Sequence, residues 1–169
     1  MFKDTKVFIM SRKLAITTLK QNIHHSTIVV SISDPNEEYP VFENENLIDV
    51  VYTKFYDVEN EQCLPAATCE DVKNIRPFID KYKNDERNIK YIIVHCGAGI
   101  SRSAAVAAAI CEYLGIKKDI FNNSEYAPNY HVYKLMCKEF GIGKTQEYYN
   151  DLFKNHEEFM KKTGESIEF

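Results

Sequence analysis

The stretch YIIVHCGAGISRS, residues 91–103, predicts the centre of the fold. Four apolar residues followed by His95 and Cys96 are typical of a buried strand, and two glycines within the next three positions end it. Arg102 and Ser103 then open an alanine-rich run that favours a helix. A cysteine therefore lies in a glycine loop between a strand and the first turn of a helix. Unpaired backbone N–H groups and the positive end of the helix dipole meet there, which favours the binding of an anion.

Length and composition restrict the class of protein. The 169 residues are enough for one hydrophobic core, so we expect a single domain over residues 1–169. The hydrophobic fraction of 44% is ordinary for a globular protein, and the formal net charge of -4 argues against an electrostatic nucleic-acid binder. No apolar run approaches the length of a membrane span, and the first residues lack the features of a signal peptide. We therefore expect a soluble, cytoplasmic monomer that binds neither nucleic acid nor membranes.

Strand and helix patterns alternate along the chain. Apolar and β-branched runs predict strands over residues 6–11, 26–33, 47–55 and 91–96. Helical spacing and capping residues predict helices over about residues 12–21, 68–82, 102–114, 130–140 and 144–162. We expect Leu14 and Leu19 to face the core, and Pro77 to kink its helix. The pattern indicates an α/β fold with a central, mainly parallel sheet of about four to five strands and helices on both faces.

The loop after the fourth strand carries groups suited to nucleophilic attack on a phosphate ester. Cysteine reacts as a thiolate, which helix N-termini and converging amides stabilise, so Cys96 is the candidate nucleophile. Gly97 and Gly99 let the backbone adopt positive φ and approach phosphoryl oxygens. Arg102 offers a planar fork for two of those oxygens, and the Ser103 hydroxyl can donate a hydrogen bond to the departing sulfur.

A general acid is also needed to protonate the leaving group. Asp57 is the candidate, because it follows a predicted strand, and parallel sheets bind ligands at the carboxyl ends of their strands. Asp34 and Asp49 compete for this role, although Asp34 precedes a proline as a turn former does and Asp49 lies within a strand pattern. We expect His95 to orient the loop from behind, and Asn129 to begin a helix and brace the loop.

The cysteines give no sign of a metal or disulfide framework. Their number is odd and their spacing fits no zinc motif; they are Cys63, Cys69, Cys96, Cys111 and Cys137. Cys111 and Cys137 fall in helical patterns and are expected in the core. We therefore predict no metal and no cofactor.

The segment HCGAGISRS, residues 95–103, resembles the H-C-x-x-G-x-x-R-S/T signature of the cysteine-dependent protein tyrosine phosphatase superfamily. Its form is similar to that of the dual-specificity branch and of related small bacterial tyrosine phosphatases. Residues 55–57 resemble the general-acid loop of that superfamily, and residues 127–129 resemble a Pro-Asn helix start common in the branch. The chain has no tryptophan and so lacks the Trp-Pro-Asp form of the acid loop, which leaves the selectivity between phosphotyrosine and phosphoserine or phosphothreonine open.

The resemblance implies a protein tyrosine phosphatase-like fold and hydrolysis of phosphorylated proteins through a phosphocysteine intermediate. It implies Cys96 as nucleophile, Arg102 as phosphate clamp, Asp57 as acid and then base, and Ser103 as an aid to thiolate release. The phosphate-binding residues would be Gly97, Ala98, Gly99, Ile100, Ser101 and Arg102. Two alternatives stay open: a catalytically silent phospho-binding module, and a phosphoinositide or RNA 5′-phosphatase.

Overall fold

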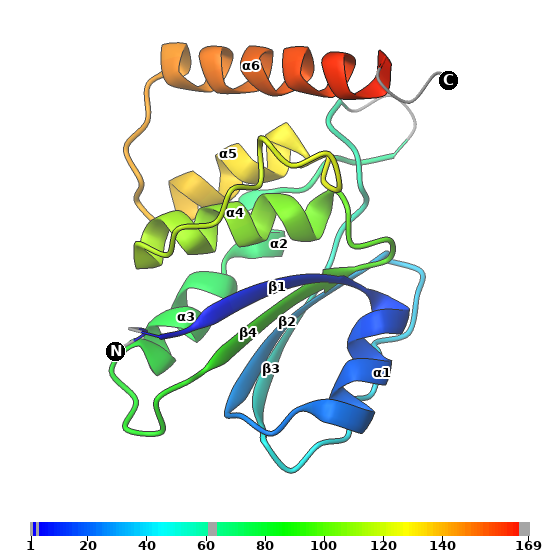
Figure 1. Ribbon diagram of the computed structural model, residues 1–169, viewed down its shortest axis with the longest axis vertical. Helices are drawn as coiled ribbons and strands as arrows, with labels where there is room; N and C mark the ends of the chain where they lie inside the picture. Colours follow the sequence, from blue (N-terminus) through cyan, green and yellow to red (C-terminus); the bar gives the residue numbers. More distant parts are fainter. Residues whose placement is uncertain (1, 3, 61–63, 166–169) are drawn as a thin grey trace.

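A four-stranded, all-parallel sheet forms the centre of the molecule (Figure 1). The structure is a computed structural model and describes residues 2, 4–60 and 64–165. The strands are β1 (Lys6–Ser11), β2 (Thr27–Ser33), β3 (Leu47–Lys54) and β4 (Tyr91–Cys96). Their order in the sheet is β1-β4-β2-β3, so β4 lies between β1 and β2. The predicted α/β fold is confirmed, with four strands.

Helices cover both faces of the sheet (Figure 1). They are α1 (Arg12–Asn22), α2 (Cys69–Val72), α3 (Ile75–Lys83), α4 (Arg102–Leu114), α5 (Tyr130–Glu139) and α6 (Gln146–Glu165). On one face, α1 packs Ala15 and Leu19 against Val29 of β2 and Ile93 of β4. The larger core lies on the other face, where α4 packs on β4 and β1, and α5 packs on α4. Since both faces are covered, β2 and β4 are buried along almost their whole lengths.

Two local predictions about the helices are wrong. Leu14 is 52% exposed, whereas Leu19 is buried as predicted, because the buried stripe of α1 runs through Ala15 and Leu19. The helix expected after Thr68 is two helices, and Pro77 is the third residue of α3. A proline in the first turn of a helix lacks an N–H that would have no partner there anyway, so no kink is needed.

Three other cysteines lie on helices: Cys69 on α2, Cys111 on α4 and Cys137 on α5. Cys111 and Cys137 are buried in the core as predicted, and burial raises the pKa of the Cys111 thiol to about 11. Cys69 is exposed at the start of α2, and Cys63 lies outside the described residues. None of the helices described has the length and apolar character of a membrane span.

Candidate active site

The loop of residues 97–101 connects β4 to α4 and forms a cradle of backbone N–H groups. Three of its carbonyl oxygens accept hydrogen bonds from neighbouring segments: Gly97 O from Arg12 N at 3.2 Å, Ile100 O from Ala127 N at 3.1 Å and Ser101 O from Asn129 N at 3.4 Å. The C=O and N–H of a trans peptide point in opposite directions. The N–H groups that follow these carbonyls therefore point away from the bracing segments and into the cradle, as an anion site requires.

Gly99 is the glycine that the shape of the loop depends on. Its φ is +76°, and a Cβ at this position would lie 2.4 Å from Met10 C and from Ser11 N. Both are backbone atoms at the junction of β1 and α1, which cannot move aside without disturbing the sheet edge. Gly97 has no positive φ, contrary to expectation, and a Cβ there would make only an ordinary contact, 3.6 Å from Arg102 NH2.

Replacing Gly99 with alanine is expected to destabilise the fold by at least about 2 kcal/mol, since the left-handed backbone and the clash with the β1–α1 junction both oppose a side chain. For a chain of this size, that corresponds to a melting temperature lower by roughly 4–8 °C. Thermal unfolding measures it, with Gly97→Ala as the control in the same loop. Equal melting temperatures for the two variants would contradict the assigned role of Gly99.

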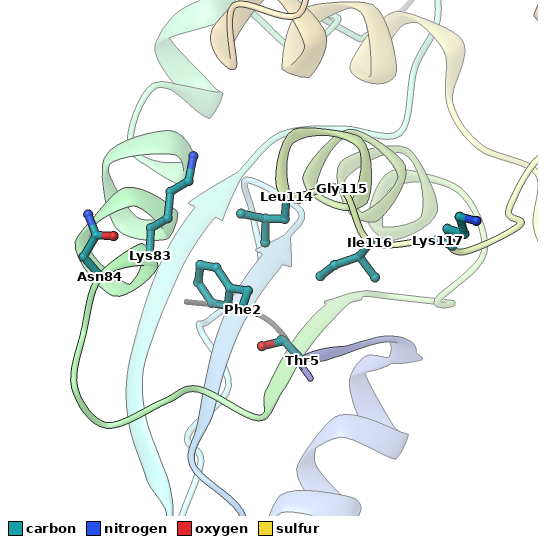
Figure 2. Close-up of a pocket in the computed structure, with 8 residues that line it drawn as sticks. All are labelled: Phe2, Thr5, Lys83, Asn84, Leu114, Gly115, Ile116 and Lys117. Carbon is teal, nitrogen blue, oxygen red and sulfur yellow. The ribbon is translucent and has the colours of Figure 1, made fainter.

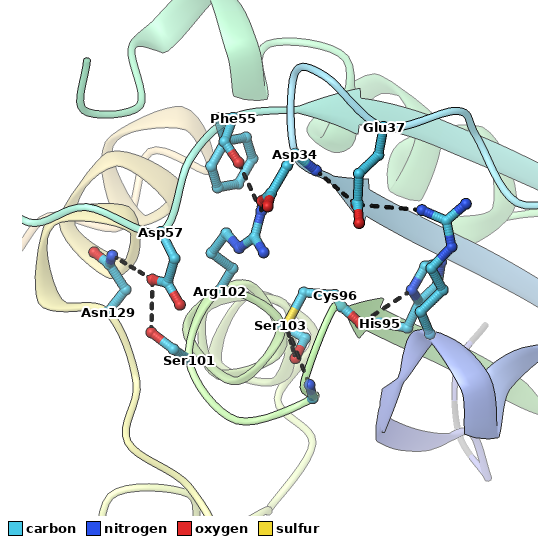
Figure 3. Close-up of polar contacts among 12 residues, drawn as sticks. Asp34, Glu37, Phe55, Asp57, His95, Cys96, Ser101, Arg102, Ser103 and Asn129 are labelled. Carbon is cyan, nitrogen blue, oxygen red and sulfur yellow. Dashed lines mark hydrogen bonds and ion pairs between the residues drawn. The ribbon is translucent and has the colours of Figure 1, made fainter. Parts of the chain in front are cut away.

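Cys96 lies at the floor of the cradle and is 2% exposed (Figure 3). The N–H of Gly99 donates to its Sγ at 3.3 Å, and the Ser103 Oγ lies 3.1 Å from the same sulfur. Two donors thus face the atom that would carry negative charge as a thiolate. The structure brings Cys96 and Ser103 together as the sequence predicts, while their roles in a reaction stay predictions.

Arg102 is 6% exposed, and one of its terminal nitrogens is fixed by the protein. NH1 donates to Asp34 Oδ1 at 2.5 Å and to the Phe55 carbonyl at 2.7 Å. Its Nε is buried and, among the described residues, has no hydrogen-bond partner. A buried donor without a hydrogen-bond partner is costly, so the Nε–NH2 edge is suited to two oxygens of a phosphate.

Asp57 lies on the other side of Arg102 from Cys96 (Figure 3). Its Oδ1 accepts hydrogen bonds from Ser101 Oγ at 2.8 Å and from Asn129 Nδ2 at 2.9 Å. Asn129 also caps α5, because its Oδ1 accepts from Val132 N at 2.9 Å. With Oδ1 held in this way, Oδ2 is the oxygen that could carry a proton to a leaving group.

His95 is fully buried behind the loop. Its Nε2 lies 2.8 Å from the Ser31 hydroxyl of β2. Burial, together with the nearby charges of Arg12 and Arg102, lowers the pKa of His95 to about 4. The ring is therefore neutral at physiological pH, which suits a hydrogen-bonding support better than a proton carrier.

The structure places the two competing carboxylates in different surroundings. Asp34 pairs with Arg102 and also forms the expected turn, since Glu37 N donates to Asp34 O at 3.0 Å. Asp49 lies on edge strand β3, where its Oδ2 accepts from Lys81 at 2.8 Å and from Tyr82 at 2.5 Å. Burial acts to raise the pKa of Asp49, but these hydrogen bonds outweigh it and lower the pKa. Asp49 is held by groups outside the cradle and is a poor candidate for the acid.

Sequence reasoning missed four contacts of the site. They are the Asp34 carboxylate and the Phe55 carbonyl at Arg102, the Ser31 hydroxyl at His95, and the Ser101 hydroxyl at Asp57. A signal for Asp34 was present, because it directly follows the predicted strand of residues 26–33. In a parallel sheet, a residue at that position can meet the carboxyl end of a neighbouring strand.

A pocket of about 650 Å³ lies elsewhere in the molecule. Phe2, Leu114 and Ile116 point toward one another in it, and Lys83 and Lys117 also line it (Figure 2). It lies near the amino ends of the strands, beside Thr5 at the start of β1, whereas Cys96 ends β4. Its size does not make it the reactive site, since the thiol, the arginine and Asp57 converge at the opposite end of the sheet.

The chain is similar to the solved structure of OH1 from the Orf virus, which is described as a tyrosine phosphatase with distinct structural features and triple substrate specificity. The similarity covers 95% of this chain and 73% of that chain, with 13% sequence identity and a TM-score of 0.45. No protein-family profile and no curated protein matches the chain. At this level of similarity, the activity of the viral protein says nothing of this site, whose chemistry depends on its own side chains.

Proposed function

We propose that this protein is a phosphomonoester hydrolase that acts on phosphorylated protein side chains, phosphotyrosine among them, without a metal ion. The observation that carries the proposal is the buried Nε of Arg102, which has no partner among the described residues and belongs to a loop whose floor is the Cys96 thiol. The oxygens of a dianionic phosphoryl group would accept hydrogen bonds both from the free edge of the guanidinium and from the inward N–H groups of the loop.

In the first step, the Cys96 thiolate attacks phosphorus. An S–P bond forms as the P–O bond to the leaving group breaks, and Asp57 Oδ2 gives its proton to the departing oxygen. In the second step, Asp57 takes a proton from water, the water oxygen attacks phosphorus, and the S–P bond breaks. Ser103 donates a hydrogen bond to the sulfur as it leaves with the electron pair, while Arg102 and the loop N–H groups stabilise the equatorial oxygens in both transition states.

The test is whether a phosphoenzyme forms on Cys96. Purified protein should release phosphate from p-nitrophenyl phosphate in the presence of a metal chelator. Acid quenching with a ³²P-labelled phosphotyrosine peptide should trap the label on the peptide that contains Cys96. Turnover with the label elsewhere would overturn the mechanism. Binding without turnover would favour a silent phospho-binding module, and a strong preference for phosphoinositides or RNA 5′-phosphates would favour the other alternative.

Replacing Asp57 with asparagine is expected to lower kcat by a factor that depends on how strongly the leaving group needs a proton. Loss of a general acid costs typically 10²–10⁴-fold when the leaving oxygen needs its proton. The loss should therefore be large for phenyl phosphate and small for p-nitrophenyl phosphate, whose leaving group is stable as an anion. Steady-state kcat on both esters measures it, with Asp49→Asn as the control carboxylate. An equal loss on the two esters would assign the acid to another group.

A further inference from the structure

The ion pair between Asp34 and Arg102 divides the guanidinium into two parts. NH1 faces Asp34 Oδ1 at 2.5 Å and the Phe55 carbonyl at 2.7 Å. Nε has no partner among the described residues, and NH2 lies near Gly97 of the cradle, 3.6 Å from where a Cβ at that position would be. The side chain is thus held at one corner, and its opposite edge is left for a ligand.

Asp34 is itself held by the turn that follows β2. Its backbone N–H donates to Glu37 Oε2 at 3.1 Å, and the same carboxylate oxygen accepts from Arg12 NH1 at 3.2 Å. The backbone N–H of Arg12 in turn donates to the Gly97 carbonyl of the cradle. Asp34, Glu37 and Arg12 therefore link the far corner of Arg102 back to the loop that surrounds the thiol.

The position of Asp34 does not suit the transfer of a proton to a leaving group. Its Oδ1 is taken by NH1, on the edge of the guanidinium that is turned away from the free Nε. Asp57, in contrast, has one oxygen held by Ser101 and Asn129, and no group among the described residues donates a hydrogen bond to the other. The two aspartates therefore have different uses at one site.

We propose that Asp34 is a positioning residue for Arg102. Its carboxylate, together with the Phe55 carbonyl, fixes NH1 so that Nε and NH2 meet two equatorial oxygens of the phosphoryl group in the transition state. This inference rests on the proposed function of the site. A guanidinium that lacks this anchor can rotate about its long side chain, and a misplacement of about 1 Å can cost on the order of 10²-fold in rate.

The experiment compares Asp34→Asn and Asp34→Ala with Asp57→Asn, on phenyl phosphate and on p-nitrophenyl phosphate. We expect Asp34→Ala to lower kcat about 100-fold, by the same factor on both esters, because the clamp acts on the phosphoryl group and not on the leaving oxygen. Asp34→Asn keeps an oxygen that can accept a hydrogen bond from NH1. Its kcat should therefore be about tenfold higher than that of Asp34→Ala. Asp49→Asn, which breaks an ion pair outside the cradle, should keep wild-type kcat.

A loss that is larger on phenyl phosphate, as expected for Asp57→Asn, would make Asp34 an acid and overturn the proposal. So would unchanged kcat in both Asp34 variants. Thermal unfolding shows whether Asp34→Ala folds; if it does not, the isosteric Asp34→Asn variant decides, since a positioning role predicts the same loss on both esters.

Binding of orthovanadate, measured by calorimetry, separates this inference from the proposed function. If wild-type protein shows no turnover, the proposed function fails, yet weaker vanadate binding by Asp34→Ala than by wild type would still support the positioning of Arg102. Equal binding would overturn it. Absence of vanadate binding by wild-type protein would overturn both.

Discussion

Replacing Cys96 with serine is expected to lower kcat on p-nitrophenyl phosphate by about 10⁴-fold or more, because the reaction loses its nucleophile. A serine hydroxyl needs a base to become reactive. Among the described residues, the sulfur has two hydrogen-bond partners, the Ser103 hydroxyl and the Gly99 N–H, and neither of them is a base. The phosphate cradle and Arg102 stay in place, so the variant should still bind a phosphotyrosine peptide. Phosphate release and fluorescence polarisation with a labelled peptide measure the two properties separately.

Cys69→Ser is the matched control, since Cys69 is exposed at the start of α2, outside the cradle. It should keep wild-type kcat. A Cys96→Ser protein with more than a small percentage of wild-type turnover would rule out the phosphocysteine route, whatever the variant binds.

Replacing Arg102 with lysine should lower kcat by roughly 10²–10³-fold, the cost typical of removing a preorganised donor to developing charge. Lysine keeps the positive charge but has a single nitrogen, which cannot serve Asp34 and two phosphoryl oxygens at once. The planar fork of Arg102 is needed most in the transition state, which vanadate resembles. The affinity for vanadate should therefore fall more than the affinity for inorganic phosphate.

Arg87→Lys is the control for this change. Arg87 pairs with Asp85 on the surface, with a side chain 50% exposed, and its replacement should leave kcat unchanged. Retention of wild-type kcat by Arg102→Lys would mean that charge alone, without the planar fork, accounts for the role of Arg102.

The backbone of this fold was predictable because its signals are local. Apolar runs marked all four strands, and Ser11 caps α1 as expected, accepting from Leu14 N at 3.2 Å. The prediction for Leu14 was wrong, because helical spacing predicts an apolar stripe but does not decide which of two adjacent stripes packs against the sheet. The single domain over residues 1–169 stays a prediction.

The site was predictable where it is continuous in sequence and less so where it is assembled in space. Cys96, Gly99, Arg102 and Ser103 lie within one loop and one helix turn. The partner of Arg102 lies in the turn after β2, and the turn-forming signal at Asp34 concealed its ion pair with Arg102. Asn129 was expected as a helix start, but the contact of its amide with Asp57 depends on two loops meeting, which no local pattern encodes.

The close approach of Gly99 to the β1–α1 junction has a consequence for folding. The register pairs Ser11 with Cys96, so the cradle is closed by contacts between the start of the chain and a strand far along it. Such long-range contacts form slowly, because closing a long loop of chain costs entropy before the contacts offset it. The anion cradle is therefore a product of the assembled sheet: an unfolded chain carries the same signature residues, but it holds an ordinary cysteine with no preference for phosphate.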